Sequence, residues 1–177
     1  PFLHRDFIYI INNLKKDLNI DLLTNLQWGH SGIEKFIQGV DPARINRNSP
    51  YPSIRVSYHP EEMGSGEKLL ESVKKIQEAG FKIGVYAVQY PSPKQLEAIT
   101  QMQFLAKNQG IDFRIKDFTG KYGGKDDTGK PFSITYGDYS KYPNSTFTKT
   151  THQCLCKTSE LLLGPNADVY RCHRDMY

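Results

Sequence analysis

The stretch that decides the fold is SIRVSYHPEEMGSGEKLLESVKKIQEAGFKIGVYAV, residues 53–88. It opens with an alternating segment, residues 53–58, whose apolar and polar side chains are expected on opposite sides of a strand. Residues 66–79 carry an apolar stripe at helical spacing and end at Gly80, a residue typical of the position after a helix. A second strand is expected over residues 81–88. This strand–helix–strand order predicts a right-handed unit with parallel strands.

The same unit recurs on both sides of this stretch. Ser31 and Glu34 form a capping box that is expected to open one helix, and Ser92 followed by Pro93 and Gln95 is expected to open another. Further strands are expected over residues 20–26 and 111–116, and further helices over residues 6–18, 31–40 and from 92 to just before Gly110.

The spacing of the strands predicts the fold class. Strand centres recur about every thirty residues and each follows a helix, which indicates an α/β fold with a parallel sheet. Four strands do not close an eight-stranded barrel, so the sheet is either open or one arc of a larger barrel. The rhythm stops near residue 120, and we expect a core over residues 1–119 and a loop-rich extension over residues 120–177. Residues 121–145 are typical of a long functional loop or a small appendage, and their Gly-rich segment, residues 123–130, is interpreted as a turn-rich loop rather than a phosphate loop.

Composition limits the class of protein. A mean hydropathy of −0.57, with no apolar run near the ~20 residues of a membrane span, argues against a membrane protein. The net charge of +4 is mild and its lysines are spread along helices, so nucleic-acid binding is not required. An odd number of cysteines and the lack of a visible leader favour a cytoplasmic protein. Because the chain begins at Pro1 in the middle of the strand–helix rhythm, we expect it to be part of a longer protein.

Candidate ligand-binding residues follow the expected strands, because parallel α/β sheets bind ligands at the carboxyl ends of their strands. Arg55 and Ser57 share the face opposite the apolar side chains of their strand, and a polar face there is expected to meet solvent or charge. Each candidate also has a purely structural interpretation. Thr24 and Asn25 would form a polar turn, His59 would be a loop histidine, and Lys116 would be a surface lysine. The other candidates are Thr24 and Asn25, Tyr86 and Gln89, and Asp117.

All three cysteines lie within the last 24 residues, as Cys154, Cys156 and Cys172. Three soft ligands in one short segment predict a metal or iron–sulfur site, although three unrelated buried thiols are the alternative. Zinc would need His152 or His173 as a further ligand, whereas an iron–sulfur cluster would need a fourth ligand from elsewhere. A single residue between the first two cysteines favours iron–sulfur over a zinc knuckle.

Several segments together are similar to the radical S-adenosylmethionine (radical SAM) enzymes that carry a C-terminal auxiliary iron–sulfur extension of the SPASM or twitch type. The tail resembles the auxiliary motif except at Ala167, where the family has glycine. The resemblance covers nearly the whole chain. The segments that carry it are Pro1–His4, Leu23–Leu26, Ser53–Pro60, Gly84–Val88, Ile111–Lys116 and Pro165–Cys172.

The resemblance implies a partial (β/α)6 TIM-like barrel that binds S-adenosylmethionine and a 4Fe–4S cluster. Such an enzyme generates a 5′-deoxyadenosyl radical, which abstracts hydrogen from a small-molecule or peptide substrate. The cysteine loop for the catalytic cluster would lie before Pro1, in a missing N-terminal part of the barrel. The implied cofactor-binding residues are Pro1, Thr24, Asn25, Arg55, Ser57 and His59, with Val85 and Tyr86 beside the adenine; Lys116 and Asp117 would lie near the substrate, and Cys154, Cys156 and Cys172 would bind the auxiliary cluster.

Two other functions remain as hypotheses. One is a zinc-stabilised α/β module that contacts nucleic acid through Lys74, Lys75 and Lys82. The other is a catalytically silent fragment that assembles with a partner chain. Bound iron or bound zinc would separate the first of these from a radical SAM enzyme.

Overall fold

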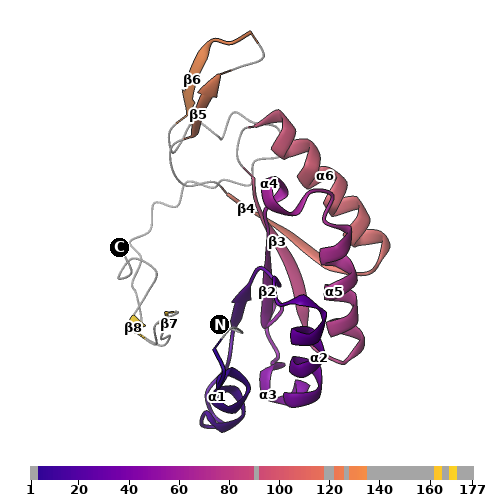
Figure 1. Ribbon diagram of the computed structural model, residues 1–177, viewed down its shortest axis with the longest axis vertical. Coiled ribbons are helices and arrows are strands. Elements are labelled where there is room, and N and C mark those ends of the chain that lie inside the picture. Colours follow the sequence, from indigo (N-terminus) through magenta and orange to yellow (C-terminus); the bar gives the residue numbers. More distant parts are fainter. Residues whose placement is uncertain are drawn as a thin grey trace. The chain divides into compact units, whose positions relative to one another are not determined.

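A parallel sheet of four strands forms the centre of the computed structural model (Figure 1). Its strands are β1 (Leu22–Thr24), β2 (Ile54–Tyr58), β3 (Ile83–Gln89) and β4 (Asp112–Asp117), and they lie side by side in the order in which they occur along the chain. Right-handed crossovers between strands in this order put every connecting helix on the same side. Figure 1 accordingly shows α2, α5 and α6 along one side of the sheet. The predicted α/β class with a parallel sheet is confirmed.

The structure describes residues 4–89, 92–117, 122–125, 128–134, 162–164 and 168–170. The chain divides into two compact units, residues 2–147 and residues 148–177. No helix in the described part of the chain combines the length and apolar character needed to cross a membrane. The helices are α1 (Phe7–Asn13), α2 (Gly29–Gly39), α3 (Pro42–Ile45), α4 (Pro60–Met63), α5 (Glu67–Glu78) and α6 (Pro93–Asn108).

The first helix is shorter than the sequence predicts. The apolar stripe predicts a helix to residue 18, but α1 ends at Asn13 and Leu14 has an extended backbone. The guanidinium of Arg44 donates to the carbonyl oxygens of Leu14, Lys15 and Leu18 at 3.0–3.2 Å, which fixes a turn there. A contact from α3 therefore overrides the local helical pattern.

The predicted capping box at Ser31 is wrong. Helix α2 begins at Gly29, so Ser31 lies inside its first turn. The chain turns earlier because Leu26 has a positive φ of 53° and donates its backbone N–H to the Thr24 hydroxyl at 3.0 Å. Trp28 then starts the helix, and its ring lies 5.5 Å from that of Phe36.

Other local predictions are confirmed. Gly80 follows the end of α5 with a φ of +93°, a conformation that costs glycine little. Ser92 is the N-cap of α6, and Pro93 is its first residue. The Ser92 hydroxyl accepts a hydrogen bond from the backbone N–H of Gln95 at 3.4 Å.

Replacing Ser92 by alanine is expected to lower the free energy of unfolding by about 1 kcal/mol, because one N–H of the first turn loses its acceptor. Chemical denaturation measures this change. Ser92→Asp restores an acceptor at the same position and is expected to recover most of the loss. Equal loss in both variants would contradict a capping role for the hydroxyl.

The core lies between the sheet and the helices. On β2 the side chains of Ile54, Val56 and Tyr58 are buried, whereas Arg55 and Ser57 are only partly buried, so the predicted alternation is confirmed. On β3 the side chains of Ile83, Val85 and Ala87 are buried as well. The core residues with no exposed surface include Phe36, Ile54, Val56, Leu70, Val73, Ile76, Val85 and Met102.

Two antiparallel hairpins complete the described structure. Strands β5 (Tyr122–Lys125) and β6 (Pro131–Ile134) pair within residues 121–145, so part of that segment is a small antiparallel appendage, and residues 123–125 of the expected turn-rich loop belong to a strand. The Gly-rich segment joins two strands and no helix, which is not the context of a phosphate loop. In the smaller unit, β7 (Leu162–Leu163) pairs with β8 (Val169–Tyr170), and the N–H of Gly164 donates to the carbonyl of Asp168.

Candidate functional site: a polar face on the sheet

The side of the sheet opposite the core carries mostly polar side chains, which alternate along each strand with the buried ones. We call this set the polar face. Strand register makes its members neighbours, because Arg55 pairs with Gly84, Ser57 with Tyr86 and Tyr86 with Arg114. Its strand residues are Arg55, Ser57, Tyr86, Asp112, Arg114 and Lys116, and its flanking residues are Asp21, Arg47 and Tyr51.

One end of the polar face is organised by Asp21. Its carboxylate accepts a hydrogen bond from Arg47 at 2.9 Å and one from Arg55 at 3.3 Å. Both guanidinium groups lie over the ring of Tyr51, at 5.1 and 5.4 Å from its centroid. Arg47 also donates to the Tyr51 hydroxyl at 2.8 Å. These contacts fix the position of Arg55 beside the start of β3.

Strand β4 carries a second ion pair. Arg114 Nε donates to both carboxylate oxygens of Asp112, at 3.1 and 3.0 Å, and its Nη2 donates to the carbonyl of Pro50 at 2.6 Å. The hydrogen bond to Asp112 raises the pKa of Arg114 above its ordinary value. The positive charge of Arg114 is therefore compensated by a neighbour on the same strand.

Tyr86 lies on β3 beside Arg114, and Lys116 lies two residues further along β4. The ammonium nitrogen of Lys116 is 5.3 Å from the centroid of the Tyr86 ring. Lys116 is exposed, but partial desolvation of its ammonium group by neighbouring atoms, and to a smaller extent the charge of Arg55, lowers its pKa. Burial also raises the pKa of Tyr86, whose hydroxyl has no hydrogen-bond partner among the described residues. Within that part of the chain Lys116 has no carboxylate at ion-pair distance.

The face has an excess of positive charge. Arg47, Arg55, Arg114 and Lys116 contribute four cations against the carboxylates of Asp21 and Asp112, which leaves a formal charge of two positive units. Arg114 pairs with Asp112, and Arg47 and Arg55 share the single carboxylate of Asp21. The uncompensated charge therefore lies at the Arg47–Arg55 pair and at Lys116, where an anion would be attracted.

The structure distributes the predicted site residues over both sides of the sheet. Arg55, Ser57, Tyr86 and Lys116 share the polar face, whereas Val85 is fully buried on the other side, so Val85 and Tyr86 point in opposite directions. Asp117 is the last residue of β4 and pairs with Gln89 in register.

The first strand ends in turns. Thr24 is buried, and its hydroxyl accepts from the N–H of Leu26. The Asn25 side chain accepts from the N–H of Gln27 at 3.3 Å. His59 is the N-cap residue of α4 and is partly buried, without a side-chain capping bond. The polar-turn interpretation therefore accounts for the local contacts of Thr24 and Asn25.

The metal-binding prediction falls outside the described residues. The residues that the structure does not describe include Cys154, Cys156 and Cys172, and also Pro1 and the two histidines considered as zinc ligands. Among the residues that the structure describes, no group of three or more His, Cys, Asp or Glu side chains could hold a metal ion. The cysteine site therefore stays a prediction.

Five further residues of the polar face were missed, one of them Tyr51 in the segment before β2. Asp112 and Arg114 alternate with apolar residues on either side of them, in the same pattern that pointed to Arg55, so this signal was present in the sequence. Asp21 and Arg47 come from segments before β1 and β2, and only the folded chain brings them together at 2.9 Å.

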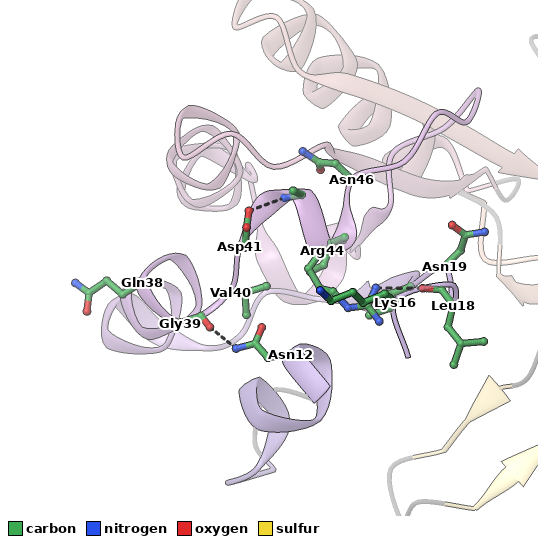
Figure 2. Close-up of a pocket in the computed structure, with 13 residues that line it drawn as sticks. Asn12, Lys16, Leu18, Asn19, Gln38, Gly39, Val40, Asp41, Arg44 and Asn46 are labelled. Atoms are coloured by element: carbon green, nitrogen blue, oxygen red, sulfur yellow. Dashed lines mark hydrogen bonds between the residues drawn. The ribbon is translucent and has the colours of Figure 1, made fainter. Parts of the chain in front are cut away.

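A separate open pocket of about 740 Å³ lies at the edge where the strands begin (Figure 2). The Asn12 side chain donates to the carbonyl of Gly39 at 2.7 Å, and Arg44 donates to that of Leu18 at 3.1 Å. The amide of Asn46 spans the carbonyl of Gly80 and the N–H of Lys82, both at 2.7 Å. These contacts tie helix ends to one another. Because ligands of parallel sheets bind at the opposite edge, we assign this pocket a structural role.

Comparison with known proteins does not assign this chain to a protein family. A scan against protein-family models and searches of curated proteins and of solved structures found no match to this chain. Fold and site define an α/β protein whose sequentially ordered parallel sheet is covered by helices on one side and presents a cationic face on the other.

Proposed function

We propose that this chain forms part of a radical SAM enzyme and that its sheet is an arc of the partial barrel. The observation that carries the proposal is the sequential order of four parallel strands with helices on one side. Doubly wound sheets reverse their strand order and place helices on both sides, whereas barrels of βα units keep the order and place helices outside. In the proposed barrel the polar face lines the interior.

Residues of β2 and of the turns that follow β1 and β2 would bind S-adenosylmethionine. Ser57, near the carboxyl end of β2, supplies a hydroxyl, and Arg55, near its amino end, supplies a guanidinium whose Nε is buried without a hydrogen-bond partner among the described residues. This donor set fits the carboxylate and ribose of the cofactor. Asn25 and His59 adjoin the carboxyl ends of β1 and β2, and Tyr86, unlike the buried Val85, can present its ring on the polar face.

When bound together, the iron–sulfur cluster and S-adenosylmethionine supply a radical that removes hydrogen from the substrate. The residues of this chain would bind and orient the reactants and exclude water. Lys116 and Asp117, at the end of β4, would adjoin the substrate. The cysteine loop for the catalytic cluster is proposed to precede Pro1, and the three cysteines of the tail are proposed to hold an auxiliary cluster.

Replacing Cys172 by alanine is expected to remove about half or more of the iron bound by the chain, because a cluster loses a thiolate ligand. Iron, zinc and sulfide per chain are measured after anaerobic reconstitution, together with visible absorbance. His30→Ala, on the exposed surface of α2, is the control and should retain the iron of the unmodified chain. Unchanged iron in Cys172→Ala would refute the cluster assignment.

The same measurement tests the zinc-binding alternative. Stoichiometric zinc without iron would favour a zinc-stabilised nucleic-acid-binding module. The lysines considered for that function all have intramolecular partners. Lys74 donates to the carbonyl of Gln109 at 3.4 Å, Lys82 donates to that of Arg47 at 2.9 Å, and Lys75 pairs with Glu34. These contacts favour a structural role for the three lysines.

A further inference from the structure

Three neighbouring residues of the polar face carry a hydrogen-bond donor without an acceptor, or a charge without a carboxylate partner, among the described residues. Arg55, Tyr86 and Lys116 come from the neighbouring strands β2, β3 and β4. The Tyr86 hydroxyl and Arg55 Nε are both buried and lack acceptors among the described residues. Lys116 lies over the Tyr86 ring with no carboxylate at ion-pair distance within the same residues. Buried donors are normally hydrogen-bonded, so this group is suited to a ligand that brings several acceptors.

We infer that Arg55, Tyr86 and Lys116 bind the phosphate group of a phosphorylated small molecule. A phosphate monoester offers three acceptor oxygens, which match a guanidinium, a hydroxyl and an ammonium group as donors. The inference rests on the proposed function only in identifying this molecule as the substrate. The binding itself requires neither iron nor S-adenosylmethionine.

Charge distinguishes phosphate from carboxylate. The polar face has a formal excess of two positive charges, and a phosphate monoester carries about −1.5 to −2 near pH 7, whereas a carboxylate carries one negative charge. Asp112 already pairs with Arg114, and one carboxylate, that of Asp21, is shared by Arg47 and Arg55, so further negative charge is needed beside Arg55 and beside Lys116. Partial desolvation and the charge of Arg55 destabilise the charged form of Lys116, an exposed residue, and lower its pKa, and a bound dianion would offset both effects.

The test compares two aromatic ligands that differ in their anionic group. Phenyl phosphate and benzoate are titrated into the 177-residue chain by calorimetry at low salt, without iron or S-adenosylmethionine. Phenyl phosphate is expected to bind about tenfold more tightly than benzoate, because it carries the additional charge. Equal affinity for the two ligands would overturn the assignment to phosphate in favour of a carboxylate site.

Three variants locate the binding. Lys116→Met is expected to weaken phenyl phosphate binding about tenfold or more, and Tyr86→Phe, which keeps the ring and removes the hydroxyl, about three- to tenfold. Lys107→Met, on the exposed last turn of α6, is the matched control and should bind like the unmodified chain. Lys116→Arg keeps the charge and should retain most of the affinity.

The remaining outcomes are decisive. A folded chain that does not bind phenyl phosphate, or one whose binding is unaffected by both Lys116→Met and Tyr86→Phe, would overturn the inference. Circular dichroism of each variant establishes that it is folded. Failure here would leave the iron measurement on Cys172→Ala unaffected, and a chain without iron could still bind phosphate, so the two proposals fail separately.

Discussion

Replacing Phe36 by alanine should lower the free energy of unfolding by about 3–5 kcal/mol. Phe36 has no exposed surface, and its ring lies 5.5 Å from that of Trp28 and 4.8 Å from that of Phe81. It therefore joins α2 to the segment that leads into β3. Truncation would remove these contacts and leave a cavity, because the surrounding helix and strand can relax only in part.

Phe104 provides a matched control on α6. Its side chain is 65% exposed, so Phe104→Ala removes the same atoms without opening a cavity and should change stability by about 0.5 kcal/mol or less. Both variants are compared by urea denaturation, with attention to the midpoint and the slope. Similar losses for the two phenylalanines would contradict the packing of α2 against the sheet.

The sequence predicted those parts of the fold that local chemistry determines. The alternation over β2, the glycine after α5 and the cap at Ser92 depend on residues within a few positions of one another. The end of α1 depends instead on a distant residue, because Arg44 donates to the carbonyls of Leu14 and Lys15 from about thirty residues away in the sequence. Local periodicity therefore predicted a helix that a tertiary contact interrupts.

The same distinction applies to the polar face. Alternation was sufficient to place Arg55 and Ser57 on one side of β2. It also implies that adjacent residues such as Val85 and Tyr86 face opposite sides, which argues against a shared role beside one ligand. The contact between Asp21 and Arg47 joins two segments without a common pattern, so the sequence alone could not reveal it.

Replacing Gly84 by alanine is expected to lower the free energy of unfolding by about 1–3 kcal/mol through overpacking. An added Cβ would lie 2.7 Å from Pro52 Cγ, 3.1 Å from the backbone oxygen of Asp112 and 3.3 Å from Asp112 Cβ. Gly84 pairs with Arg55 on one side and Asp112 on the other, so relief requires movement of the loop before β2 or of the β3–β4 pair. Thermal and chemical denaturation measure the loss.

Pro52→Ala tests which neighbour resists the added methyl group. Truncating Pro52 removes the closest atom, Cγ, but leaves the Asp112 oxygen in place. The double variant should therefore lose less stability than the two single variants added together, with some loss remaining from the contact to β4. Strict additivity would mean that Pro52 does not obstruct the methyl group. A stable Gly84→Ala variant would mean that β3 and β4 are not packed as closely as this register requires.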